Sequence, residues 1–148
     1  MSKTLAEGNQ YEIASLRLNE NTCLGIARYF IKRTGDLTEA YKFANLAAEM
    51  FPTSGEAYTT KGYILHKMNR TSEARIKLEE AIRLNPNSSR PHSFLGDVYS
   101  AVGNVTSAQI HYRYVLGLNS SDNFTKLKLA FLNVNTGREK DLMEAEQL

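Results

Sequence analysis

The sequence predicts an all-α fold in which antiparallel helix pairs stack into an α-solenoid. Three observations support this expectation. Residues of the same kind return at a fixed interval, each interval contains two stretches of apolar residues at helical spacing, and turn residues separate the stretches. One helix pair of this size cannot bury its apolar face alone, so neighbouring pairs must pack on one another.

The fixed interval is 34 residues, which is the difference between Pro52 and Pro86. Other small and turn residues follow the same step: Ala40, Ala74 and Ala108; Gly62 and Gly96; and Gly35, Asn69, Gly103 and Gly137. Residues of the last series tolerate left-handed backbone angles and predict a turn between the two helices of each pair. The segments match without gaps, which places repeat units at 21–54, 55–88 and 89–122.

An additional helix is expected before the repeats. Residues 1–20 precede the first unit, and Ala6, Ile13 and Leu16 predict a leading helix over 3–18.

The unit at 21–54 is the least regular of the three. Arg28 stands where the two later units have glycine. Asp36 with Glu39 resembles a capping box, which predicts that the second helix of this unit begins after Asp36.

The unit at 55–88 shows both helices clearly. The first helix carries Tyr58, Gly62 and Leu65 on one face, and the second carries Ala74, Leu78 and Ala81. Thr53 with Glu56 fits a capping box before the first helix, and Pro86 ends the second. The small residues are expected where the two helices cross, because larger side chains there would push the backbones apart.

The unit at 89–122 repeats this arrangement, with Gly96, Ala108 and Val115 at the expected crossing. Residues 123–148 begin like a fourth unit but depart from the pattern at Leu142, which stands where a small residue is expected. This segment is interpreted as a partial fourth unit or as C-terminal capping helices.

These positions together resemble the tetratricopeptide repeat family. The residues that carry the likeness are Tyr58, Gly62, Leu65, Ala74, Leu78, Ala81 and Pro86 in one unit, and Leu95, Gly96, Tyr99, Ala108, Tyr112 and Val115 in the next. The resemblance implies a right-handed α-solenoid of about three repeats with flanking helices. It also implies a protein-interaction scaffold in which the first helix of each pair lines a concave groove.

The composition excludes several classes of protein. A net charge of +2 is too small to indicate a nucleic-acid binder held by phosphate contacts. There is no apolar run of about 18 residues that could form a membrane span, and the first twelve residues are polar. The sequence therefore favours a cytoplasmic location, and the secretory lumen stays open if the chain is a fragment.

No catalytic constellation is visible, so the sequence predicts a protein that is not an enzyme and that has no metal site and no cofactor. His66, His92 and His111 fall on different predicted helices and are interpreted as core or surface residues. Cys23 is the only cysteine, which rules out an internal disulfide and favours a structural role.

Five N-x-[ST] sequons fall in predicted turns, at Asn69, Asn87, Asn104, Asn119 and Asn123. Turn chemistry is the favoured interpretation, in which the asparagine suits the turn and the Ser or Thr two residues later caps the next helix. Glycosylation in the secretory pathway remains the alternative.

Under the resemblance, twelve residues are expected to line the groove: Ile26, Tyr29, Lys32, Arg33, Thr59, Tyr63, His66, Lys67, Arg90, Phe94, Asp97 and Phe131. Aromatic residues run along the middle and basic residues lie toward one edge, which predicts a peptide or protein partner with both apolar and acidic residues. For Tyr29 and Tyr63 the alternative, packing against a neighbouring repeat, stays open.

One binding mode of the family is not expected. Members that clamp the C-terminal carboxylate of heat-shock chaperones use Lys, Asn, Asn, Lys and Arg, and the matching positions here hold Gly25, Tyr29, Thr60, Arg90 and Phe94. Only Arg90 is compatible with such a clamp.

Three functions remain open from the sequence. The first is a non-catalytic scaffold or adaptor that binds a partner in the groove. The second is a regulatory or targeting region of a larger enzymatic or secretory-pathway protein. The third is self-association through the terminal helices, near Leu5 and Ile13 or near Leu142 and Met143.

Overall fold

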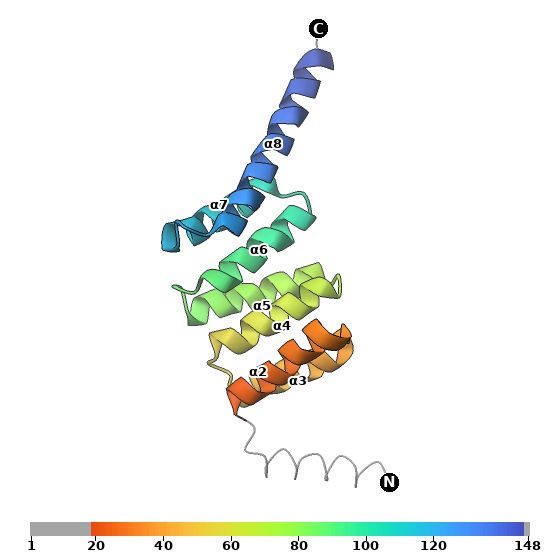
Figure 1. Ribbon diagram of the computed structural model, residues 1–148, viewed down its shortest axis with the longest axis vertical. Coiled ribbons are helices and arrows are strands. Elements are labelled where there is room, and N and C mark those ends of the chain that lie inside the picture. Colours follow the sequence, from red (N-terminus) through yellow and green to blue (C-terminus); the bar gives the residue numbers. More distant parts are fainter. Residues whose placement is uncertain (1–18, 147–148) are drawn as a thin grey trace.

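The computed structural model describes residues 19–146, and their helices pack as antiparallel pairs in one elongated stack (Figure 1). In chain order the elements are α2 (Glu20–Tyr29), the π-helical turn η1 (Phe30–Thr34), α3 (Leu37–Met50), α4 (Gly55–Lys67), α5 (Thr71–Leu84), α6 (Ser89–Ala101), α7 (Val105–Leu118) and α8 (Asn123–Glu146). No strand occurs between residues 19 and 146. The predicted all-α solenoid is confirmed. The leading helix expected over 3–18 lies outside the described residues.

Residues with left-handed backbone angles form the turn between the two helices in three pairs, as the repeat predicted. Gly35, Asn69 and Gly103 have φ of 67°, 61° and 81°. The prediction of a fourth turn at Gly137 is wrong, because Gly137 lies within the continuous helix α8. Glycine permits a left-handed turn without imposing one, and the residues that follow it, from Arg138 onward, favour helix. The C-terminal segment is therefore one long helix and not a helix pair.

Side-chain caps begin several of the helices, but only some of these caps are at the predicted residue, and α5 and α6 have none. Asp36 Oδ1 accepts a hydrogen bond from the Glu39 amide at 3.1 Å, as expected for the start of α3. For α4 the cap is Ser54, which accepts from the Ala57 amide at 3.1 Å, and not Thr53. The cap thus falls one residue later than the sequence pattern indicated.

Close helix crossings form the centre of the second and third repeats. A Cβ atom added to Gly62 would lie 2.6 Å from Leu78 Cγ, and one added to Gly96 would overlap the ring of Tyr112. The facing residues of the second helices, Ala74 and Ala108, are completely buried. The small residues therefore allow the paired helices to approach, as expected from the repeat.

We expect Gly62→Ala to lower the free energy of unfolding by about 1–3 kcal/mol, because the new methyl group overlaps Leu78. Gly25→Ala is the matched control, since Gly25 is also helical but has no heavy atom within 4 Å of the added Cβ. The control should gain about 0.5–1 kcal/mol from helix propensity alone. Urea denaturation of both variants measures the two changes, and equal effects would contradict the close crossing.

A histidine pair joins α6 to α7, which the spread of histidines over different helices did not indicate. His92 Nδ1 lies 3.0 Å from His111 Nδ1, so one ring donates and the other accepts. The His92 ring stacks on Tyr114 with centroids 3.9 Å apart, and Tyr99 stacks on His111 at 5.6 Å. Burial lowers the pKa of both histidines, and the His111 charge adds to this for His92. Both rings are therefore neutral in the folded protein near neutral pH.

This pair should make the fold sensitive to acid. The folded protein binds protons at these histidines less tightly than the unfolded chain, so stability is complete above about pH 6.5 and falls as the unfolded chain takes up protons below it. We therefore expect the melting temperature of the His92→Gln/His111→Gln variant to fall less between about pH 7.5 and about pH 5 than that of the original protein. His66 remains in both proteins and cancels from the comparison. An equal loss in both would exclude the pair as the cause.

Candidate functional site

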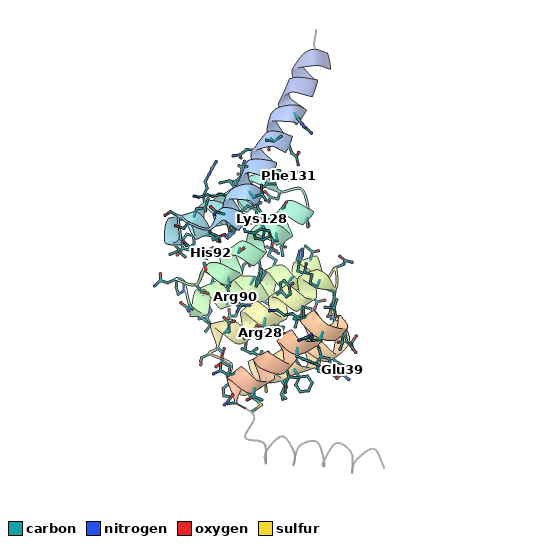
Figure 2. All side chains as sticks on the ribbon, viewed as in Figure 1. Arg28, Glu39, Arg90, His92, Lys128 and Phe131 are labelled. Carbon is teal, nitrogen blue, oxygen red and sulfur yellow. The ribbon has the colours of Figure 1, made fainter. Side chains whose placement is uncertain are left out.

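The first helices of successive pairs form one face of the stack and enclose a groove of about 490 Å³. We call it the arginine pocket; its lining residues are Arg28, Ile31, Lys32, Thr60, Tyr63, Arg90 and Phe94. These residues come from α2 with η1, from α4 and from α6, so three repeats contribute. Arg28 on α2 and Arg90 on α6 belong to the first and third repeats, and both are labelled in Figure 2.

Two guanidinium groups in this pocket share one carboxylate. Glu56 Oε1 accepts a hydrogen bond from Arg28 Nη2 at 2.6 Å and another from Arg90 Nη1. Lys32 adds a third positive charge, so three cations and one anion leave a net charge of +2 around the pocket. Burial, followed by the nearby Arg28 charge, lowers the pKa of Arg90. Because a guanidinium stays protonated, a second anion would relieve the repulsion.

Aromatic rings form the apolar part of the pocket. The rings of Tyr63 and Phe94 are tilted against each other with centroids 4.8 Å apart. The Arg90 guanidinium lies 5.6 Å from the centroid of Phe94. Thr60 is buried, and its Oγ1 has no hydrogen-bond partner among the described residues. The pocket thus combines cationic donors, an unpaired hydroxyl and aromatic surface.

The π-helical turn η1 carries two of the lining residues, Ile31 and Lys32. Phe30 stacks on Phe43 of α3 with centroids 5.9 Å apart, which holds the turn against its partner helix. Thr34 donates its hydroxyl to the Phe30 carbonyl at 3.0 Å. Such turns are rare within α-helices and are frequent at functional sites. No sequence pattern indicated this one.

A second pocket of about 310 Å³ lies between α6, α7 and α8, where Asp97, Lys128 and Phe131 are among the lining residues. The carboxylate of Asp97 in this pocket already has partners within the fold. Asp97 accepts from Lys128 Nζ at 2.8 Å and from the Tyr112 hydroxyl at 2.5 Å. Burial, together with the bond to Asp97, raises the pKa of Tyr112. The charge of Asp97 is therefore compensated by Lys128, whereas the arginine pocket keeps an excess of positive charge.

The twelve predicted groove residues fall into several environments. Lys32, Tyr63, Arg90 and Phe94 line the arginine pocket, and Asp97 and Phe131 line the second pocket. Tyr29, Arg33 and Lys67 are exposed outside both pockets, and Ile26 and His66 are half-buried outside them. Thr59 is buried and donates its hydroxyl to the Gly55 carbonyl at 2.7 Å, so its predicted place on the groove surface is wrong.

Three residues of the arginine pocket were not among the predicted groove residues: Arg28, Ile31 and Thr60. One of them carried a sequence signal. Arg28 replaces the glycine that the other two units have at the same position, and such a departure from a repeat marks a residue for another role. Ile31 gave no comparable signal, because its position depends on the π-helical turn.

The described residues were also compared with the requirements of a reactive cysteine, a metal site and a membrane span. Cys23 is completely buried, and burial raises the pKa of its thiol. Among the described residues, no group of three or more His, Cys, Asp or Glu side chains is placed to hold a metal ion. None of the described helices has the length and hydropathy needed to cross a membrane.

Sequon asparagines take part in turn chemistry, although not in the way the sequence suggested. Asn104 itself caps α7 by accepting from the Ser107 amide at 3.2 Å, and Thr106 is not the cap. Asn119 accepts from the Ser121 amide at 3.1 Å. Asn69 supplies the left-handed turn before α5, whose cap position is Arg70 and not Thr71.

Stacked antiparallel helix pairs with a groove along the first helices define a helical-repeat solenoid. The tetratricopeptide repeat model matches residues 55–88. The match identifies a tetratricopeptide repeat at residues 55–88, and the described residues share the fold of tetratricopeptide repeat solenoids. No curated protein matches the sequence.

Solved structures share the fold at low sequence identity. The first tetratricopeptide repeat domain of Spaghetti (RPAP3), bound to the HSP90 peptide SRMEEVD, is 16% identical with a TM-score of 0.74, and the match covers 80% of this chain and 93% of that one. MamA is 18% identical with a TM-score of 0.75, covering 91% and 78%. An O-GlcNAc transferase of Thermobaculum terrenum is 21% identical with a TM-score of 0.71, covering 76% of this chain and 22% of that one.

Proposed function

We propose that this chain is a non-catalytic interaction scaffold and that its arginine pocket holds a peptide segment with an acidic side chain beside apolar ones. The observation that carries the proposal is the sharing of Glu56 by Arg28 and Arg90 next to the Tyr63–Phe94 pair. This arrangement offers charge and apolar surface to the same ligand.

The ligand carboxylate would accept hydrogen bonds from the guanidinium groups of Arg28 and Arg90. Each guanidinium has five N–H donors, and the single oxygen of Glu56 uses only part of them. A neighbouring aliphatic or aromatic side chain would pack on Tyr63 and Phe94, since aromatic residues are frequent hot spots of binding.

The Spaghetti domain supports this proposal, because a similar fold there is bound to a peptide that contains two glutamates and an aspartate. In this chain, however, the matching clamp positions include Gly25 and Tyr29 and keep only Arg90 as a suitable cation. We therefore propose recognition of an acidic residue within a segment, without dependence on a free C-terminus.

A second candidate is a regulatory or targeting region within a larger protein. The specific observation in its favour is the Thermobaculum terrenum O-GlcNAc transferase, in which the similar region covers only 22% of the chain. In this case too the groove would hold a protein segment, and the catalytic activity would lie in another part of the protein.

The test is selection from a displayed random-peptide library, followed by affinity measurement on synthetic peptides. We expect enrichment of peptides with acidic and apolar residues. Arg28→Gln/Arg90→Gln should weaken the selected peptides at least about tenfold, because hydrogen bonds to charged groups contribute about 1.5–3 kcal/mol. Binding by the original protein should fall as salt rises.

Arg83→Gln/Arg113→Gln removes the same charge from exposed sites outside the pocket and serves as the matched control. Amidation of the peptide C-terminus should leave the affinity unchanged. Equal weakening by both arginine pairs would contradict binding in the pocket, and a large effect of amidation would indicate a carboxylate clamp.

Replacing the carboxylate of the same pocket, by Glu56→Gln, should change the affinity in the opposite direction to the arginine substitutions. The substitution removes the carboxylate that pairs with Arg28 and Arg90 and keeps a similar shape, so acidic peptides should bind more tightly than they do to the original protein. Isothermal titration of one peptide and of its Glu-to-Gln counterpart measures this. The gain should be confined to the acidic peptide, and weaker binding would show that Glu56 orients the arginines for the ligand.

A further inference from the structure

Helix α8 carries an apolar stripe that the other residues between 19 and 146 leave uncovered. Phe124, Leu127, Phe131 and Val134 are 52–67% exposed, although each is a large apolar residue. The opposite side of the helix is used in the fold, where Thr125 is buried and Leu132 packs on Ala108 and Tyr112 of α7. The stripe therefore lies beside the face that docks α8 onto the stack, and Phe131 also borders the second pocket.

The stripe has the spacing of a two-helix seam. Its members follow one another at intervals of 3, 4 and 3 residues, the pattern that keeps apolar residues facing a partner helix in a coiled coil. At 24 residues α8 is also much longer than the other α-helices between residues 19 and 146, which have 10 to 14 residues. It projects beyond the stack (Figure 1), so a partner helix has access along it.

The charge along α8 changes sign from one end to the other. Residues 123–137 contain Lys126 and Lys128 and no acidic residue. Because Lys128 pairs with Asp97 of α6, Lys126 is the basic residue of this half that a partner helix would meet. Residues 138–146 contain two basic residues (Arg138, Lys140) and four acidic ones (Glu139, Asp141, Glu144, Glu146), a net charge of −2. Two copies placed antiparallel bring opposite charges together, whereas a parallel pair brings like charges together. The helix is thus complementary to itself in one orientation only.

Arg138 agrees with this orientation. It occupies the next place in the stripe, four residues after Val134, where a charge would disfavour an apolar seam. In an antiparallel pair centred between Val134 and Asn135, the midpoint of α8, position 138 is level with position 131 of the second copy. Arg138 then meets the exposed ring of Phe131, and the two-fold symmetry makes this contact twice.

We propose that two copies of this chain associate through antiparallel pairing of their α8 helices. The contact is independent of the arginine pocket, which is built from α2, η1, α4 and α6. A single helix pair buries a small interface, so the dimer is in reversible exchange with the monomer. The dimer would place two groove-bearing stacks at opposite ends of one assembly.

The first test is sedimentation velocity of the whole chain over a concentration series. The mass should rise from 16.6 kDa toward twice that value, 33.2 kDa. Leu127→Asp/Val134→Asp should remain monomeric throughout. Both side chains are exposed, so circular dichroism and thermal melting should confirm that this variant is folded.

Ile76→Asp/Ile110→Asp is the matched control, because these residues are equally apolar and 54% and 59% exposed but lie on α5 and α7. It should dimerise like the original protein. A monomer at every concentration of the original protein would overturn the proposal. So would a dimer that survives the α8 substitutions, because its interface would then lie elsewhere.

Cysteine cross-linking tests the orientation. The native Cys23 is completely buried, so it should add no background. Val134→Cys lies at the two-fold axis of the antiparallel pair and should form a disulfide-linked dimer under mild oxidation. Leu127→Cys should not, because its two copies would be about 22 Å apart along the helices. Efficient linking at both positions would indicate a parallel pair and contradict the charge argument.

Discussion

The close crossing of the two helices within a repeat depends on the missing side chains at Gly62 and Gly96. Leu78 and Tyr112 occupy the space that a Cβ atom would need at these glycines. With the helices this close, Ala74 and Ala108 are completely buried. Leu78 then packs in one cluster with Leu95 and Val98 of the next pair. The stacking of pairs, and with it the alignment of the first helices on one face, follows from this contact.

The repeat at 21–54 departs from this arrangement, and the residues that depart from it line the arginine pocket. Arg28 takes the place of the glycine, and its long cationic side chain extends to Glu56 of the next repeat instead of lying between helices. The same unit ends its first helix in the π-helical turn, which supplies Ile31 and Lys32 to the pocket. The chemistry of the groove therefore comes from residues that break the repeat.

The two pockets differ in how their charges are balanced. Asp97 lies against Lys128 and Tyr112, so its charge is compensated and its role is to join α6, α7 and α8. Glu56 is one carboxylate for two arginines, both partly exposed to solvent. Neutral or compensated groups hold the fold together, while an excess of positive charge is left on the surface where a ligand can reach it.

The sequence by itself determined the helix pairs, the interval between them, the small residues at the crossings and three left-handed turns, because each of these is local or repeats at a fixed spacing. It also assigned Tyr63, Arg90 and Phe94 to one groove, and these three residues line the same pocket of the structure. Only the tertiary structure decided that Arg28 and Arg90 share Glu56, because these residues lie on three helices and their distances depend on how the repeats stack. The continuity of α8 through Gly137 was likewise beyond the sequence pattern, since a glycine is compatible with both a turn and a helix, and the neighbouring residues decide between them.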